Sequence, residues 1–464
     1  MLLTRLRSTT AAKRVCSYTK PFGQYSIREI SMSAQPRAFT GDLSEAELSA
    51  LRANKDRLMH DLHFSCQWGS GIRWGSDPTE TGMQRLALSQ DDKSVRDWFV
   101  QKMKQLRCRV DVDEMGNIFA VRPGRRKDVP ATFIGSHLDT QPTGGRYDGI
   151  LGVLAGIEAL QVIDDLGIES EGGIGVVNWT NEEGARFPMT ILASGVWAGS
   201  FYLAHAHSLK EVPTMASLPT ASTQPDTVKS ALEKIEYLGD IPCSYEAMPM
   251  AAHFELHIEQ GQSVGVAIGA QAYRWYRIRV TGSDCHSGTT AFEHRADAMY
   301  ASAQMIVNAR EAVATYGCLA IPGLATFSLD VRGPTMDAVI QTETLLRSEF
   351  AQIAQRGGKP CMVEWQLDFD SPEVEFHPSC IDCVQESAEA VVLDPQSQIR
   401  HMVSGAGHDT VSTSKRVPSS MIFVPCREGV SHHPQEYCTP EDCAMGASVA
   451  LQAALRYDRK RFSS

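Results

Sequence analysis

The sequence predicts an α/β protein in which a domain built on a mostly parallel sheet is interrupted by a smaller inserted α/β domain. Strand candidates in the first half of the chain lie at 109–112, 117–122, 131–136 and 173–180. A long apolar helix, 149–165, connects the last two, which is the βαβ pattern of parallel sheets. The pattern changes at about 268 and resumes after 374. We therefore expect a main domain of 41–267 plus 375–464, an inserted domain of 268–374, and a disordered segment, 1–40.

The remaining elements follow from local patterns. Helical spacing places apolar side chains on one face of two segments that we expect to cover the sheet, 44–65 and 92–107. In the inserted domain, strands should alternate with helices at 294–313 and 335–355. The tail should add a helix, a buried strand and a final helix, at 380–392, 421–425 and 440–455.

Composition excludes several classes of protein. The chain has 464 residues, 43% of them hydrophobic and 21% charged, which is ordinary for a globular protein of two domains. The longest apolar run, 149–163, is too short to span a bilayer and contains Glu158. Without the first 40 residues the balance is 37 basic to 54 acidic residues, so we expect neither nucleic acid nor a membrane as a partner.

The first 40 residues carry seven Arg or Lys, one Glu and many Ser and Thr. This composition is typical of a mitochondrial transit peptide. A disordered basic tail is the alternative, and a start at Met32 would give a cytoplasmic form.

Twelve Cys lack the spacing of a secreted disulfide framework, so we expect reduced thiols. The CxxC pair Cys380 and Cys383 lies in an amphipathic stretch, which favours buried helical thiols over zinc or redox chemistry.

The stretch 131–149, ATFIGSHLDTQPTGGRYDG, reads as a buried strand that ends in a Gly-rich loop before a helix. It places His137, Asp139 and Asp148 at the carboxyl end of the strand, where open α/β sheets bind ligands. We expect His137 and Asp148 to bind metal and Asp139 to orient His137 from outside the ligand set. Alone, such a loop is as readily solvated polar surface.

A second apolar run, IGVVNWT, ends in NEEGARF and sets Glu182 beside Glu183. Adjacent carboxylates repel, and a divalent metal that takes one as ligand leaves the other as a proton acceptor. We assign Glu183 to the metal and Glu182 to catalysis. A solvated loop is the alternative.

Two further segments supply imidazole. In FELHIEQG (254–261) His257 alternates with apolar residues along a strand, and GVSHHPQE (429–436) offers His432 and His433, of which we select His432. His205 and His207 are discounted because no strand end presents them. The resulting set has no thiolate and suits zinc, with manganese, cobalt or nickel possible. Five ligands exceed one tetrahedral ion, so we expect two divalent ions bridged by Asp148.

Eight motifs now resemble a known family. GSHLDT, GGRYDG, NEEGARF, HIEQG, CHSGTT, FSLDVR, GAGHDT and GVSHHPQE occur in order between Leu43 and Leu455. They are similar to those of the zinc amidohydrolases that include N-carbamoyl-L-amino acid hydrolases, allantoate amidohydrolases and yeast-type β-ureidopropionases, relatives of aminoacylase-type metallopeptidases. His257 favours this branch, since simple peptidases usually have a carboxylate at that position.

The resemblance implies further roles and a ferredoxin-like inserted domain, here called the lid. His286 in CHSGTT would polarise the scissile carbonyl, Arg332 in FSLDVR would pair with the substrate carboxylate, and Gln260 and His408 would contact substrate. Relatives place a strand and an Asn-bearing loop before the Pro-Gly that precedes FSLDVR. Here Leu319 occupies the place of Asn. Either the lid is one strand short, which predicts a weaker hold on substrate, or coding sequence has been dropped from the predicted gene.

The sequence therefore predicts a binuclear-metal hydrolase of N-carbamoyl amino acids that releases amino acid, ammonia and carbon dioxide. We expect a homodimer formed through the lid, in doubt if that strand is missing. The alternatives are an allantoate amidohydrolase, a simple aminoacylase or peptidase, and an inactive binding relic.

Overall fold

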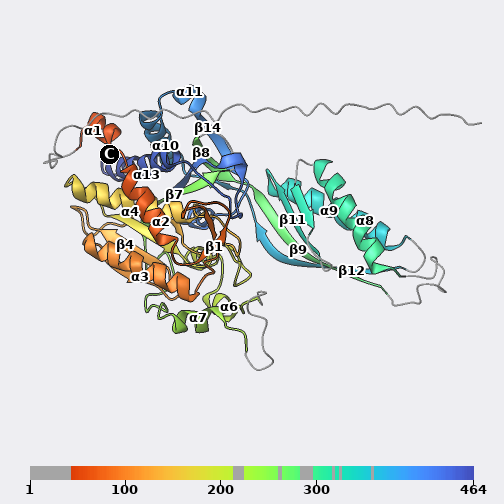
Figure 1. Ribbon diagram of the computed structural model, residues 1–464. Helices are drawn as coiled ribbons and strands as arrows, with labels where there is room; N and C mark the ends of the chain where they lie inside the picture. Colours follow the sequence, from red (N-terminus) through yellow and green to blue (C-terminus); the bar gives the residue numbers. More distant parts are fainter. Residues whose placement is uncertain are drawn as a thin grey trace, which may run out of the picture.

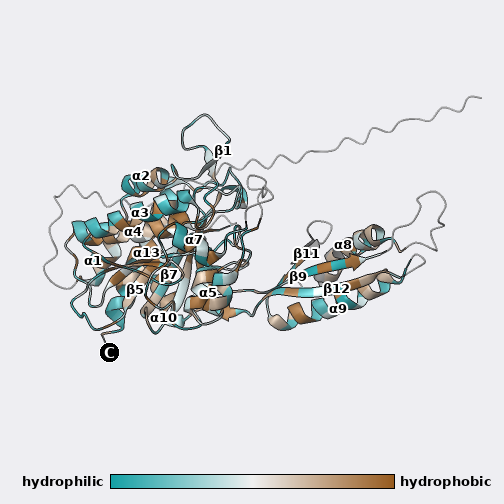
Figure 2. Ribbon diagram, turned by 90° about the horizontal axis from the view of Figure 1, so that it is seen from below, coloured by the Kyte–Doolittle hydropathy of each residue, from teal (hydrophilic) through white to brown (hydrophobic). Residues whose placement is uncertain are grey.

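The computed structural model describes residues 43–212, 224–259, 264–282, 296–315, 319–322, 327–356 and 360–463. They form two parts, a body and a smaller lid, which lie side by side and are joined where β9 and β12 leave the body (Figures 1 and 2). The predicted transit segment, Gln260 and His286 lie outside the described residues, so their assignments stay predictions. Among the described helices, none has the length and apolar character needed to cross a bilayer.

The body is built on a nine-stranded sheet of order β13-β8-β15-β7-β5-β6-β4-β3, with β14 paired to β8. Its four central strands, β6, β5, β7 and β15, run parallel, whereas β4 and β3 continue antiparallel at one side. The strands are β3 (Arg109–Val112), β4 (Ile118–Arg122), β5 (Ala131–His137), β6 (Ile174–Trp179), β7 (Met250–Glu259), β8 (Val264–Ala270), β13 (Val374–Glu375), β14 (Ile399–Ser404) and β15 (Ser419–Pro425).

Helices α2, α4, α10 and α13 pack together on the sheet, while the short α5 and α12 contact each other and α12 contacts β7 and β15. The helices of the body are α1 (Glu45–Ala50), α2 (Lys55–Ser65), α3 (Gln90–Gln105), α4 (Ile150–Asp165), α5 (Leu192–Trp197), α6 (Leu203–Ser208), α7 (Val228–Lys234), α10 (Pro378–Val391), α11 (Pro395–Gln398), α12 (Asp409–Thr413) and α13 (Pro440–Lys460). A 3-10 turn, η2 (Arg427–Gly429), and a hairpin of β1 (Ser70–Arg73) and β2 (Thr81–Met83) complete the body.

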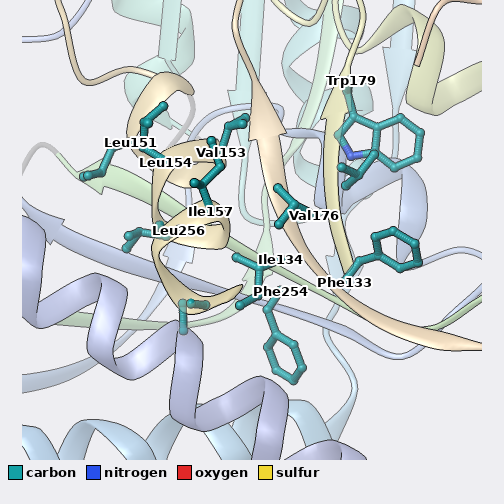
Figure 3. Close-up of a cluster of buried hydrophobic side chains, with 14 of the residues drawn as sticks. Phe133, Ile134, Leu151, Val153, Leu154, Ile157, Val176, Trp179, Phe254 and Leu256 are labelled. Atoms are coloured by element: carbon teal, nitrogen blue, oxygen red, sulfur yellow. The ribbon is translucent and has the colours of Figure 1, made fainter. Parts of the chain in front are cut away.

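The helix α4 is apolar almost all round because the sheet, α2 and α13 enclose it. Figure 3 shows its side chains packed against those of β5, β6 and β7. Close approach needs Gly152, since a Cβ there would lie 2.4 Å from the carbonyl oxygen of Leu256. The one acid in its middle, Glu158, is paired with Arg57 of α2 at 2.7 Å. This packing fixes the position of α4, which begins at Ile150, and so also fixes the backbone at Asp148, two residues earlier.

The lid has the element order β9-α8-β10-β11-α9-β12 and an antiparallel sheet of order β10-β11-β9-β12, which is the ferredoxin-like plan. Its elements are β9 (Ala272–Thr281), α8 (Ala298–Thr315), β10 (Leu319–Pro322), β11 (Phe327–Gly333), α9 (Met336–Ala354) and β12 (Met362–Ser371). Its own core includes Tyr276, Ile278, Leu329, Leu346 and Phe350.

The expectation of a lid one strand short is wrong for the described residues. Strand β10 pairs with β11 in register from Leu319 opposite Arg332 to Pro322 opposite Leu329. The strand has only four residues and ends in Pro, so it shows no period-2 alternation and resembles a turn in the sequence. Leu319 is nevertheless a cross-strand neighbour of Arg332.

Aromatic side chains join the lid to the body. Ile191 and Phe201 of the body pack with Tyr273, Trp275 and Phe369 of the lid strands. The rings of Tyr273 and Phe369 are stacked with centroids 5.2 Å apart. The backbone links are short, since Gln271 alone separates β8 from β9 and two residues separate β12 from β13.

We predict that Arg96→Met lowers the free energy of unfolding by about 3–5 kcal/mol, because it leaves a buried carboxylate without its charge partner. Arg96 and Asp92 are both fully buried and 2.9 Å apart. Urea denaturation followed by circular dichroism measures the change. The exposed pair of Lys55 and Glu441 gives the control, Lys55→Met, with an expected loss of about 0–1 kcal/mol. Equal effects at the two sites would contradict this account.

Candidate metal centre

Polar side chains leave the central strands of the body at the carboxyl ends. Strand β5 ends at His137, β7 carries His257 two residues before its end, and β6 ends three residues before Glu182. Strand β15 leads through η2 to His432. Because these four strands are parallel neighbours, their ends meet at one edge of the sheet.

Asp148 lies at the middle of the site. One of its oxygens, Oδ1, is 3.0 Å from Nε2 of His257 and 3.7 Å from Nε2 of His137. The other, Oδ2, is 3.3 Å from Nε2 of His432. Two groups of potential ligand atoms result, each within 4.8 Å, and they share Asp148; they are His137, Asp148 and His257, and Asp148, Glu183 and His432. The predicted ligand set is thus brought together, in the arrangement that a bridging carboxylate requires.

The adjacent acids point to different partners. The carboxylate of Glu183 lies 3.4 Å from His432, and the Gln141 amide donates to it at 2.7 Å. The carboxylate of Glu182 lies 3.4 Å from Nε2 of His137. Left-handed backbone at Asn181, with φ of 56°, makes the turn in which both acids face the site.

Asp139 contacts His137 as expected, but through its backbone carbonyl and not through its carboxylate. Nδ1 of His137 donates to the backbone carbonyl of Asp139 at 2.9 Å, whereas the carboxylate is 4.0 Å from that nitrogen. The carboxylate instead accepts the backbone N–H groups of Glu182 and Glu183, each at 3.3 Å. Asp139 therefore holds the turn that presents both acids.

The donor set fits divalent metal. The bond from Nδ1 of His137 leaves Nε2 as the free lone pair, and this nitrogen is buried without a hydrogen-bond partner among the described residues. Nδ1 of His257 is likewise used, by the carbonyl of Ile258 at 3.0 Å. Gly149, with φ of 65°, makes room, because a Cβ there would lie 2.2 Å from the His137 ring. A buried imidazole nitrogen that has no hydrogen-bond partner and faces carboxylates is arranged as a metal ligand would be.

The electrostatics also call for a cation. Burial raises the pKa of Glu182 well above its usual range, and the neighbouring carboxylates of Asp409 and Glu183 raise it further. Burial and Asp148 likewise raise the pKa of Glu183 to about 8. So many buried acids repel one another unless positive charge lies among them.

Two residues that the sequence did not single out hold Asp148. The buried carboxylate of Glu436 accepts the backbone N–H groups of Tyr147 and Asp148, at 2.9 and 3.0 Å. The Ser431 hydroxyl donates to Asp148 at 2.7 Å. Both residues belong to the motif GVSHHPQE, so only their closeness to His432 in the sequence could have indicated that they lie at the site.

Residues of the lid and of the loop before α12 approach the centre. The His408 ring is buried and lies 4.4 Å from the ring of His257, centroid to centroid. Arg332 is held by Asp330, at 3.0 Å, and donates to the carbonyl of Gly405. These positions are compatible with substrate contacts.

The discounted residues lie elsewhere. Nε2 of His207 is bonded to the carbonyl of Glu114 at 2.9 Å, and His205 is exposed. Cys380 and Cys383 are buried free thiols of α10, and burial raises the pKa of both.

We predict that Asp148→Ala loses metal at both groups together with activity, because one shared ligand is removed. Asp139→Asn should weaken metal affinity by about 10–100-fold, through the turn of the two glutamates, without removing a ligand. Elemental analysis after dialysis against graded chelator measures both effects. Asp128→Ala changes an exposed acid and is the control. Full occupancy of two ions in Asp148→Ala would contradict the bridging role.

Known proteins of similar sequence and structure identify the family of this chain. Residues 133–456 match the model of peptidase family M20/M25/M40. The N-carbamoyl-L-amino-acid amidohydrolase of Rhizobium meliloti is 35% identical, over 87% of this chain and 96% of the relative. The ureidoglycolate hydrolase of Arabidopsis thaliana is 28% identical, over 81% and 82%. A crystal structure of an amidase of the hydantoinase/carbamoylase family from Burkholderia multivorans has a TM-score of 0.74 and 36% identity, over 88% of this chain and 98% of that one. The chain therefore belongs to peptidase family M20/M25/M40, and within it to the metal-binding amidohydrolases that act on C–N bonds of non-peptide amides.

Proposed function

We propose that the protein hydrolyses the ureido C–N bond of N-carbamoyl amino acids and releases the amino acid, ammonia and carbon dioxide. The observation that carries the proposal is the pair of ligand groups that share Asp148, with Glu182 beside them. The similarity to the Rhizobium meliloti amidohydrolase over most of both chains supports the substrate class.

Two divalent ions fit the proposal, most simply zinc, with manganese, cobalt or nickel possible. His137, Asp148 and His257 would hold one ion, and Asp148, Glu183 and His432 the other. When bound, the ions supply Lewis acidity that activates water and polarises the carbonyl.

Glu182 is the proton carrier of the reaction. Its carboxylate lies 3.4 Å from Nε2 of His137, beside both ligand groups, where it can take a proton from water. The same side chain then delivers that proton to the departing nitrogen, which leaves as ammonia, and the carbamate that remains on the amino acid loses carbon dioxide. Asp139 keeps Glu182 in place through the backbone N–H bond at 3.3 Å.

Arg332 is the group that would hold the substrate carboxylate. Its planar fork matches a carboxylate geometrically, and Asp330 orients it through contacts at 3.0–3.2 Å. The ring of His408 lies against that of His257, tilted by 55° with the centroids 4.4 Å apart. His286 and Gln260 remain proposed substrate contacts on the strength of their motifs alone.

A second candidate substrate is ureidoglycolate, because the Arabidopsis thaliana relative bears that name. Both candidates combine a ureido group with a carboxylate and release ammonia. A deacylase or peptidase would release no ammonia from these compounds, and a binding relic would turn over neither. Ammonia release from each compound separates the two ureido substrates from the other readings, and release of a free amine or acid from a simple N-acyl amino acid separates a deacylase from a relic.

We also propose a homodimer formed through the lid. Helix α8 exposes several large apolar side chains on its outer surface, with Met299 72% and Val307 63% exposed. Val307→Lys should produce monomers in sedimentation velocity, because it places a charge in the contact. Met362→Lys alters an exposed apolar residue of β12, the other edge of the lid sheet, and should leave the dimer intact. A monomeric parent protein would end this proposal.

We predict that Glu182→Gln keeps its metal but loses about 10²–10⁴-fold in kcat, because the amide cannot accept the proton. Steady-state ammonia release measures the rate, and metal analysis shows whether the site is loaded. Glu233→Gln, an exposed change on α7, is the matched control. Turnover at the parental rate would remove Glu182 from the mechanism.

We predict that Arg332→Lys lowers kcat/KM for N-carbamoyl acids roughly 10-fold, because a point charge replaces a two-pronged donor and a hydrogen bond to a charged group contributes about 1.5–3 kcal/mol. Arg277→Lys, on β9 of the same sheet, should have no such effect. Equal kcat/KM values in both variants would show that the carboxylate is held elsewhere.

A further inference from the structure

Tyr273 occupies the junction of lid and body, directly across the sheet from Arg332. The two residues are register partners on β9 and β11, and the guanidinium of Arg332 lies 5.2 Å from the centre of the Tyr273 ring. The ring of Phe369 stacks on the Tyr273 ring, with the centroids 5.2 Å apart. The position of Arg332 is therefore tied to that of Tyr273.

The Tyr273 hydroxyl meets the loop that joins β14 to α12. The residue is only 2% exposed, and a Cβ placed on Gly407 would lie 2.5 Å from this hydroxyl oxygen. Thr190 lies near the hydroxyl, but no described residue completes a hydrogen bond with it. Two residues earlier, a Cβ on Gly405 would meet nothing within 4 Å. The loop therefore has no room for a side chain at Gly407, where Tyr273 lies against it, but has room for one at Gly405.

This contact is continuous with the metal centre. His408 follows Gly407 and packs on His257, whose Nε2 is 3.0 Å from Asp148. On the other side, Arg332 donates to the carbonyl of Gly405. The separation between Arg332 and the ligand groups therefore depends on how closely Tyr273 approaches the loop.

We propose that the contact between Tyr273 and Gly407 is a spacer that sets the length of ureido acid that the site accepts. This inference rests on the proposed function, in which the ureido group lies at the metal groups and the carboxylate at Arg332. N-carbamoylglycine and N-carbamoyl-β-alanine differ by one methylene between those two ends. A wider junction favours the longer compound, and Tyr273 acts as a positioning residue through Arg332.

The test introduces and then relieves a clash. Gly407→Ala should push Tyr273 and the lid outward and raise the preference for N-carbamoyl-β-alanine over N-carbamoylglycine by ~10-fold, which is within the ~100-fold effect that a misplacement of about 1 Å can have. Adding Tyr273→Phe removes the hydroxyl that clashes and should restore the parental preference. Gly405→Ala, in the same loop, should leave the preference unchanged. Tyr273→Phe alone should shift the preference toward the shorter compound.

Binding is measured by calorimetry with each compound in a Glu182→Gln background, metal-loaded, so that the ligand is not consumed. Hydrolysis by the parent protein is followed in parallel. Preference ratios that are equal in Gly407→Ala and Gly405→Ala, or no reversal by Tyr273→Phe, would overturn the spacer. If Gly407→Ala does not fold, a preference ratio in Tyr273→Phe equal to that of the parent protein would also overturn the spacer. Binding without hydrolysis in the parent refutes the proposed function alone, and failure of the parental site to bind either compound overturns both.

Discussion

Everything at the metal centre depends on gathering several carboxylates and imidazoles out of water at one edge of the sheet. Each buried carboxylate raises the pKa of the others, so the arrangement is stable only with positive charge among them. Asp148 differs from the other buried carboxylates. Although burial opposes its ionisation, His257 and His432 hold its pKa well below its usual range. The carboxylate nearest the imidazoles is therefore the one that is ionised and able to face both groups.

The surrounding scaffold is fixed to serve this arrangement. Asp148 precedes an apolar helix that is clamped between the sheet and α13, and its backbone N–H is tied to Glu436. His137 needs Gly149 to fit against the start of that helix. The two glutamates are set by a single carboxylate, that of Asp139. Small changes in these supports would alter the site without touching a ligand.

The sequence allowed the ligands to be predicted because each lies at or just beyond a strand that is recognisable by its apolar run, and parallel strands end at one edge. It did not reveal the supports. The role of Glu436 depends on backbone N–H groups nearly 290 positions away, and the bond from His137 to a carbonyl rather than to a carboxylate is a matter of local geometry. Strand β10 was missed because four residues that end in Pro carry no periodic signal, although pairing with β11 is enough to form it.

The insertion point of the lid has a structural consequence of its own. Residues Ala270 and Val374 are paired across adjacent strands of the body sheet, so the chain leaves and re-enters the body at neighbouring positions. The body's hydrogen-bond ladder is complete at that point whatever lies between them. A tight reverse turn from Ala270 to Val374 would preserve the same strand pairing. The lid can therefore change in sequence and shape while the fold that carries the ligands stays the same.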